Sequence, residues 1–227
     1  MDQTQPATDD PNHDGVLSLA SELERLRVPM PLEKVQQLAA YRDALWEANQ
    51  RLNLTRHTTD ALFAARDVLD SLAFAAALAP GEDVLDVGTG GGVPGVILGI
   101  VRPDVSISLA ESIGKKAAAV EDIVKQLGLP MAVHHRRAEE LFADGHTFDT
   151  LVIRAVAKLS KLLSSFAPHW GLFRRMLVLK GPRWVDERAE ARHRGLMHDV
   201  ELRKLTTYIN PDNAAESTLL ELTMGHG

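Results

Sequence analysis

The sequence contains no cysteine, which excludes a disulfide framework, a thiolate nucleophile and a cysteine-ligated zinc site. It also lacks a run of about 20 apolar residues, so we predict no membrane span. The first 14 residues have no apolar segment behind a basic start and therefore do not resemble a secretory signal. We expect a cytoplasmic protein. His134 and His135 would face opposite sides of a strand, and no other acid or histidine has ligand spacing to them, so we predict no metal ion.

Positive charge is also scarce. The chain has 25 Lys and Arg residues against 31 Asp and Glu residues, a net charge of -6, with a pI near 5.8. This balance is the opposite of the basic footprint of a protein that holds nucleic acid over its whole surface. Any contact with nucleic acid must therefore be local. A chain of 227 residues, 45% of them hydrophobic, is long enough for one full core, and we expect one structural domain.

Three regions follow one another along the chain. Residues 1–15 are polar and acidic, and we predict a disordered tail. In residues 16–79 apolar residues recur at helical spacing, as at Val35, Leu38 and Leu45, which predicts a helical N-terminal extension. Residues 80–227 contain short aliphatic runs separated by stretches long enough for helices, which indicates an α/β core.

These short runs predict the strands of a mostly parallel seven-stranded sheet covered on both faces. The last two runs follow one another without room for a crossover helix, so we expect a C-terminal antiparallel hairpin. The predicted strands are Asp83–Val87, Val105–Ala110, Met131–His134, Phe148–Ile153, Met176–Leu179, Glu201–Ile209 and Thr218–Thr223.

The strongest motif is the glycine-rich segment that follows the first predicted strand. Four of the five residues from Gly88 to Gly92 are glycine, and such a segment lets the backbone approach a ligand closely. Its amides and the start of the next helix could receive a carboxylate or a phosphate. Gly90, Gly92 and Gly95 also fit the G-x-G-x-x-G pattern of nicotinamide-dependent oxidoreductases, which stays an alternative.

Asp86 argues against that alternative. A carboxylate two positions before the first glycine is unexpected where a pyrophosphate must lie. It can instead accept from a cationic amino group, which favours the methionine part of S-adenosylmethionine. Glu111, at the end of the second strand, can accept both ribose hydroxyls of an adenosine, although it could also serve only as an acid at a helix start. After the third strand, in Arg137-Ala138-Glu139-Glu140, an acid can bond the adenine amino group and an apolar side chain can cover the ring, although such residues also occur at ordinary helix starts.

Several blocks in this order resemble the ribosomal RNA small subunit methyltransferase G family, also called glucose-inhibited division protein B. The resemblance runs from about Trp46 to Gly181. The blocks are Asn53-Leu54-Thr55, Arg66-Asp67-Val68-Leu69-Asp70-Ser71, Asp86 to Gly95, Glu111 to Lys116, Arg137 to Leu141, Arg154 to Ala157 and Leu179-Lys180-Gly181.

This resemblance implies a Rossmann-like class I methyltransferase fold with a helical N-terminal extension. The implied activity is the transfer of a methyl group from S-adenosylmethionine to N7 of a guanosine in 16S ribosomal RNA. We expect a monomer that acts on 16S ribosomal RNA or the 30S particle. The family's cofactor contacts would fall on Gly88, Val93, Ala138, Glu139 and Arg154, with Glu111 at the ribose, beside Asp86 and Gly90 from the motif. The RNA-side and catalytic candidates would be Asn53, Arg66, Arg137, Arg154 and Lys180.

The chain departs from the family pattern at two places that concern RNA. The family usually has histidine where this chain has Asp67, which would put an anion near the expected RNA path. A basic pair before the last strand is replaced by Glu216-Ser217, which removes an expected phosphate contact. A ribosome-associated protein that binds the cofactor without catalysis is therefore a further alternative. Asn53 could read a base edge or cap a helix, and Lys180 could meet a phosphate or remain solvated.

Overall fold

The N-terminal part of the chain is helical. The computed structural model describes residues 11–154, 156–212 and 214–225, and residues 1–10 of the predicted tail lie outside them. Helix α1 spans Pro11–Arg25, so the prediction of disorder is wrong for residues 11–15. The helix extends this far because Leu19 and Leu23 bury its second half, and the buried Arg42 bonds the Gly15 carbonyl at 3.0 Å.

Two further helical stretches complete this region. Helix α2 (Leu32–Asn49) buries Leu38 and Leu45. The second stretch is continuous and consists of α3 (Asp60–Leu62), the π-helical turn η1 (Phe63–Val68) and α4 (Leu69–Ala75). The Thr59 hydroxyl caps its start by accepting from the Leu62 amide. Our division of the chain at residue 80 stays a prediction.

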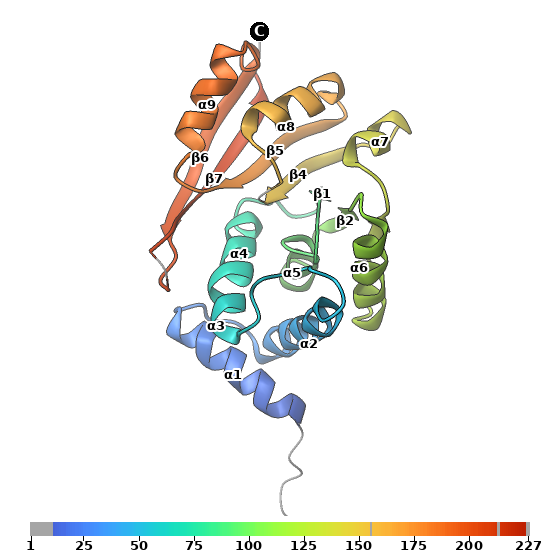
Figure 1. Cartoon of the computed structure of the whole chain (residues 1–227), viewed down its shortest axis with the longest axis vertical. Helices are drawn as coiled ribbons and strands as arrows, with labels where there is room; N and C mark the ends of the chain where they lie inside the picture. The colour runs from blue at the N-terminus through green and yellow to red at the C-terminus, as the bar shows by residue number, and fades with distance from the viewer. Residues whose placement is uncertain (1–10, 155, 213, 226–227) are drawn as a thin grey trace, which may run out of the picture.

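The described residues form a seven-stranded sheet in the order β3-β2-β1-β4-β5-β7-β6. The first five strands are parallel, whereas β7 is antiparallel to both β5 and β6. The predicted mostly parallel sheet with a C-terminal hairpin is confirmed, and Figure 1 shows the hairpin at the edge of the sheet. The strands are β1 (Asp83–Val87), β2 (Ser106–Ala110), β3 (Ala132–His134), β4 (Phe148–Arg154), β5 (Phe173–Lys180), β6 (Val200–Ile209) and β7 (Glu216–Met224).

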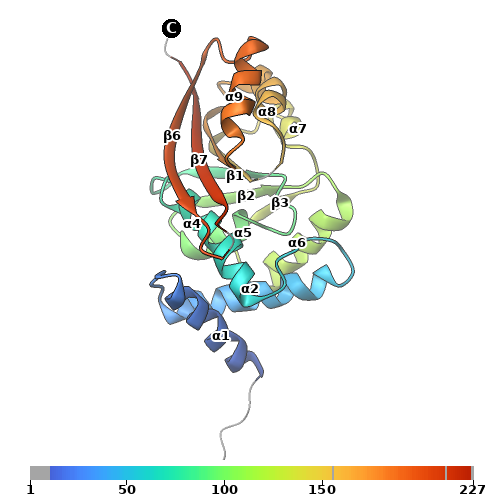
Figure 2. The ribbon, with the colours of Figure 1, turned by 60° about the vertical axis from the view of Figure 1, so that its left-hand side comes forward.

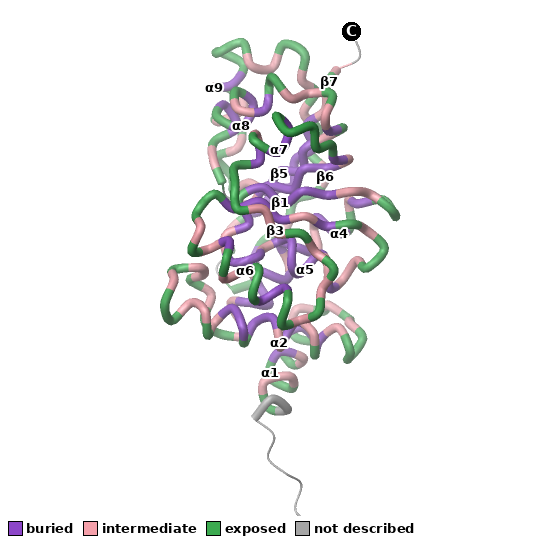
Figure 3. Tube along the Cα trace, turned by 90° about the vertical axis from the view of Figure 1, so that its right-hand side faces the viewer, coloured by how far each residue is buried: buried purple, intermediate pink, exposed green. Residues whose placement is uncertain are grey.

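Helices cover both faces of this sheet, as Figures 1 and 2 show. The crossover helices are α5 (Gly95–Val101), α6 (Gly114–Gln126), α7 (Ala138–Ala143), α8 (Leu159–Phe166) with the 3-10 turn η2 (Ala167–His169), and α9 (Trp184–His193). Neighbouring strand residues point to opposite faces, so Val84 joins the cluster under α1, α2, η1, α4, α5 and α6, while Leu85 joins the cluster under α7, α8 and α9. The helical extension thus packs on the sheet itself, and buried residues run through the centre of Figure 3.

Arg175 forms a group of polar contacts at the end of the sheet opposite to the glycine-rich segment. Arg175 in β5 donates to Glu82 at 2.7 Å, to Glu221 at 2.8 Å and to the Ala77 carbonyl at 2.8 Å. Its side chain is only 18% exposed, whereas that of its neighbour Arg174 is 81% exposed. Arg175 is therefore not a solvated surface arginine, because it neutralises two carboxylates at the start of the sheet.

Arg175→Ala should destabilise the fold by about 3 to 5 kcal/mol, because it leaves Glu82 without a cation and Glu221 with only the exposed Arg203. Arg174→Ala removes an exposed arginine from the same strand and should change stability by less than about 1 kcal/mol. Urea unfolding of both variants would measure the difference. Equal effects of the two substitutions would contradict the assignment.

Candidate cofactor and acceptor pockets

The Asp86 side chain fixes the glycine-rich segment through hydrogen bonds. This carboxylate, 1% exposed at the end of β1, accepts from the Thr89 hydroxyl at 2.6 Å and from the Gly95 amide at 2.8 Å. A Cβ on Gly95 would lie 2.7 Å from the same oxygen, so only glycine fits here. Asp86, predicted to face the cofactor's amino group, thus shapes the loop between β1 and α5.

The loop amides are largely used within the protein. The Gly88 and Thr89 amides bond the Ala110 carbonyl, and the Gly92 amide bonds the Thr89 carbonyl. The first amide of α5 bonds Asp86 and is not free for an external anion, so the role of this helix start as an anion receiver stays a prediction. A pyrophosphate cradle needs these amides free, and the loop is therefore unsuited to the dinucleotide alternative.

Glu111 closes the second strand as predicted. It is 6% exposed, and its carboxylate accepts from the Gly90 amide at 3.0 Å and from the Ile113 amide at 2.8 Å. Each carboxylate oxygen has a further lone pair for an external donor. Glu111 thus joins the glycine-rich segment to the end of β2, at the crevice where α/β sheets bind ligands.

Next to Glu111, a small cavity of about 120 Å³ lies at the ends of β1, β2 and β4. The predicted Ala138 and Glu139, at the start of α7, line it together with Gly88. The predicted Arg137 lines it as well and is exposed. Ala110 and Phe166 also line this cavity, so it combines apolar walls with the carboxylate of Glu139.

A larger pocket of about 520 Å³ opens on the other side of Gly88, which lines both cavities. The glycine-rich segment, the ends of β4 and β5, the loop before α3 and the start of β7 build its wall. The predicted Arg66, Val93, Arg154 and Lys180 line it, as do Glu216 and Ser217. Asn53 is exposed and lies outside the lining, so the structure does not bring it together with the others.

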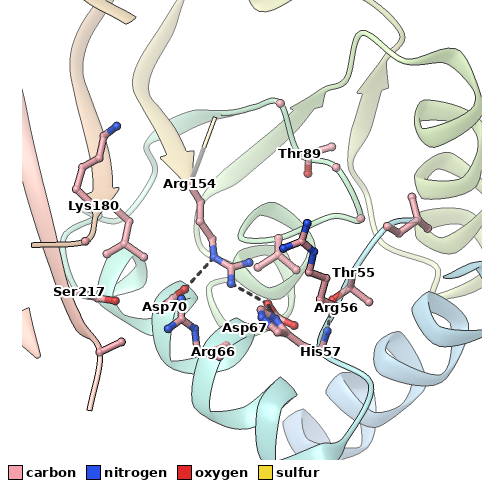
Figure 4. Close-up of a pocket in the computed structure, with 18 of the residues that line it drawn as sticks. Thr55, Arg56, His57, Arg66, Asp67, Asp70, Thr89, Arg154, Lys180 and Ser217 are labelled. Atoms are coloured by element: carbon pink, nitrogen blue, oxygen red, sulfur yellow. Dashed lines mark hydrogen bonds and ion pairs between the residues drawn. The ribbon is translucent and has the colours of Figure 1, made fainter. Parts of the chain in front are cut away.

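Arg154 is the central cation of this pocket (Figure 4). Its Nε donates to Asp70 at 2.9 Å, and its Nη2 lies 2.9 Å from Asp67. The acids raise the pKa of Arg154, although burial, the largest influence, lowers it. Within the described residues no partner contacts its third nitrogen, Nη1. Asp67 is 1% exposed, so its carboxylate is not presented to the solvent. It neutralises Arg154 instead.

Lys180 also has protein partners. Its ammonium group donates to the Ala157 carbonyl and lies 2.8 Å from Glu187 in α9. The side chain is 9% exposed, so it fixes the loop after β4 against α9 rather than reaching outward. The expectation that Lys180 is free to meet an RNA phosphate is therefore not supported by its contacts.

Sequence reasoning missed the loop that faces Arg154. Thr55, Arg56 and His57 line the larger pocket, although only Asn53 of this block was predicted as a site residue. The Asn49 side chain accepts from the Leu54 and Thr55 amides at 2.8 and 3.0 Å and so fixes the loop at the end of α2. The adjacent Asn53-Leu54-Thr55 block was the signal that could have found these residues.

The extension also supports the glycine-rich segment. The buried Tyr41 hydroxyl in α2 donates to the Gly91 carbonyl at 2.9 Å. A Cβ on Gly91 would lie 2.8 Å from Leu45 of the same helix, so the two surfaces are in close contact. The helical extension is therefore part of the site.

A family model described as rRNA small subunit methyltransferase G matches residues 34–214. The chain belongs to this family. It is 48% identical over 171 residues to the ribosomal RNA small subunit methyltransferase G of Rhodopirellula baltica, covering 75% of this chain and 74% of that protein. The relative from Pelodictyon phaeoclathratiforme is 37% identical over 182 residues, covering 79% of each chain. The resemblance read from the motif blocks is confirmed.

Solved structures agree on the fold. The magnesium protoporphyrin IX methyltransferase of Synechocystis, solved with bound S-adenosylhomocysteine, superposes with a TM-score of 0.54 at 14% identity, covering 83% of this family member and 100% of that chain. The predicted class I methyltransferase fold is confirmed. Over the residues that the structure describes, no helix is long and apolar enough to cross a membrane, and no group of three or more His, Asp or Glu could hold a metal ion.

The stability of this family member should depend on pH through Asp86. Burial raises its pKa from 3.8 to about 6, against the lowering effect of its bonds from Thr89 and Gly95. The folded state therefore keeps a proton that the unfolded chain releases between about pH 4 and 6. The resulting stabilisation is fully present below pH 4 and is lost as the pH rises through 6.

Asp86→Asn keeps an oxygen that can accept both bonds and removes this titration. The free energy of unfolding of the unmodified chain relative to the variant should fall by on the order of 1–3 kcal/mol from pH 4 to pH 7. Urea unfolding at several pH values would measure it. Parallel pH profiles would show that Asp86 does not titrate in this range.

Proposed function

We propose that this chain transfers a methyl group from S-adenosylmethionine to N7 of a guanosine in 16S ribosomal RNA. The observation that carries the proposal is the pair of cavities that meet at Gly88, one suited to an adenosine and one holding a buried arginine with a free donor. Membership of the rRNA small subunit methyltransferase G family supports the ribosomal RNA acceptor.

The residues present fit this cofactor. Glu111 has lone pairs left for the ribose hydroxyls, and Ala138 and Glu139 line the cavity for adenine. Gly88 has a φ of 69°, and a Cβ there would meet Val156 at 3.1 Å, so this crossing point needs glycine. Arg154 Nη1 would bind the methionine carboxylate, at the side of the pocket that Gly90 and Val93 also line.

When bound, S-adenosylmethionine supplies an electrophilic methyl group. Guanine N7 carries an in-plane lone pair and no proton, so its methylation needs no general base. This suits a pocket in which the carboxylates of Asp67 and Asp70 are already paired with Arg154. The protein's contribution is to orient the two reactants, for which roughly 7 to 11 kcal/mol is the upper range in model systems. The purine has to leave its stack to enter the pocket.

The positive charge available to RNA is local, and the residues that carry it differ from those predicted. Arg56, on the pocket wall, and Arg183, directly after the wall residue Pro182, are exposed and have no ion-pair partner among the described residues. These two arginines and Arg66 replace Lys180 as the candidates for phosphate contacts. Because the acidic chain offers so few cations to RNA, the 30S particle is the preferred substrate in this proposal. The protein would act as a monomer in the cytoplasm.

Methyl transfer from labelled S-adenosylmethionine to unmodified 16S RNA and to 30S subunits tests this function. Reduction and aniline scission would locate N7-methylguanosine at one position, with more label on the particle. Label at another atom, or none despite cofactor binding, would refute the proposed acceptor, and the latter result would favour the cofactor-binding protein without catalysis. Equal label on free RNA and particles would refute the preference for the particle.

Arg56→Ala and Arg183→Ala should each weaken RNA binding and lower the slope of log affinity against log salt by about 0.7 to 0.9 per lost phosphate contact. Affinity for S-adenosylhomocysteine should stay unchanged. Arg174→Ala is the matched control, because this exposed arginine lies at the opposite end of β5 from Lys180. A salt slope unaffected by either substitution would remove these residues from the RNA path.

A further inference from the structure

A chain of polar contacts links the loop before α3 to Arg154. His57 Nδ1 lies 2.8 Å from Asp67 Oδ1, and the same oxygen lies 2.9 Å from Arg154 Nη2. On the other side of the guanidinium, Asp70 accepts from Arg154 Nε at 2.9 Å and from the Tyr208 hydroxyl at 2.5 Å. Figure 4 shows Arg154 above the two carboxylates, with His57 beside Asp67.

The two carboxylates determine the direction of the guanidinium. Asp67 lies in η1 and Asp70 in α4, one helical turn apart, and they engage Arg154 through Nη2 and Nε. A planar guanidinium bonded at these two nitrogens cannot rotate without losing one of the bonds. Its remaining nitrogen therefore has one fixed direction in the pocket.

His57 in turn determines the direction of Asp67. The Oδ2 atom of Asp67 is buried and has no hydrogen-bond partner within the described residues. His57 and Arg154 therefore both contact the other carboxylate oxygen, Oδ1. The terminal torsion of an aspartate is broad, and a carboxylate held by one donor can turn. A second donor on the same oxygen restricts this rotation and leaves Oδ1 in place for Arg154.

We propose that His57 and Asp67 are positioning residues that act on cofactor binding through Arg154. The proposal rests on the proposed function only in taking Arg154 as a cofactor ligand. His57 comes from the loop that lines the acceptor side of the pocket, and its main-chain carbonyl accepts from Trp46 in α2 at 2.8 Å. The loop that faces the acceptor thereby determines how firmly Arg154 is presented to the cofactor.

Calorimetric titration with S-adenosylhomocysteine tests this relay without any methyl acceptor. His57→Ala should weaken binding about tenfold, and Asp67→Asn about 10- to 100-fold, because small displacements of an orienting group have effects of this size. His57→Ala should still fold, because Asp67 keeps its ion pair with Arg154, and its thermal unfolding midpoint is measured alongside the affinity. His57→Gln, which can still donate to Asp67, should recover most of the affinity.

The exchange variant His57→Asp with Asp67→His distinguishes the positioning of Arg154 from a structural contact that only connects the loop before α3 to η1. It can keep a histidine–aspartate pair between the two segments but puts an imidazole where Arg154 needs a carboxylate. We expect it to bind as weakly as Asp67→Asn. Thr58→Ala, an exposed neighbour, is the control and should bind normally.

Unchanged affinity in His57→Ala, or full affinity in the exchange variant, would overturn the proposal. If Asp67→Asn does not fold, the two His57 variants still decide the result. Failure of methyl transfer to 16S RNA with weakened cofactor binding in His57→Ala would refute the proposed acceptor and leave the relay standing. The reverse pattern would refute only the relay.

Discussion

The contact between Arg154 and the carboxylates of Asp67 and Asp70 organises much of this molecule. It joins the end of β4, in the middle of the sheet, to the helical stretch of the N-terminal extension. A guanidinium that is 15% exposed is tolerated there because two buried acids compensate its charge. The same contact holds a charged group in the wall of the larger pocket. The stability of the extension on the sheet and the chemistry of the site therefore share one interaction.

The parts of the site that follow a local pattern could be predicted from sequence. Asp86, the glycine-rich segment and Glu111 lie at the ends of strands, and strand ends can be located from alternation and turn residues. Ala138 and Glu139 lie beside them as expected, because parallel strands end at the same edge of the sheet. The strands themselves were found for the same reason, to within a few residues.

What the sequence could not give is which charges pair across long separations. Lys180 meets Glu187 in α9, and Arg154 meets acids from a helix far away in the chain. From the sequence alone, Asp67 was predicted only to put an anion near the expected RNA path. It is a buried counter-ion, because the π-helical turn η1 directs it into the pocket. Such pairings depend on tertiary packing, for which a local pattern carries no signal.

The position of β7 in the sheet has a consequence for the order in which the protein can assemble during synthesis. β6 precedes β7 in the chain but reaches the sheet only through it, since β7 lies between β5 and β6. A growing chain therefore carries β6 without a partner strand until β7 has left the ribosome. Residues of β7 also supply part of the larger pocket. A nascent chain thus lacks part of the wall of the larger pocket until β7 has joined the sheet.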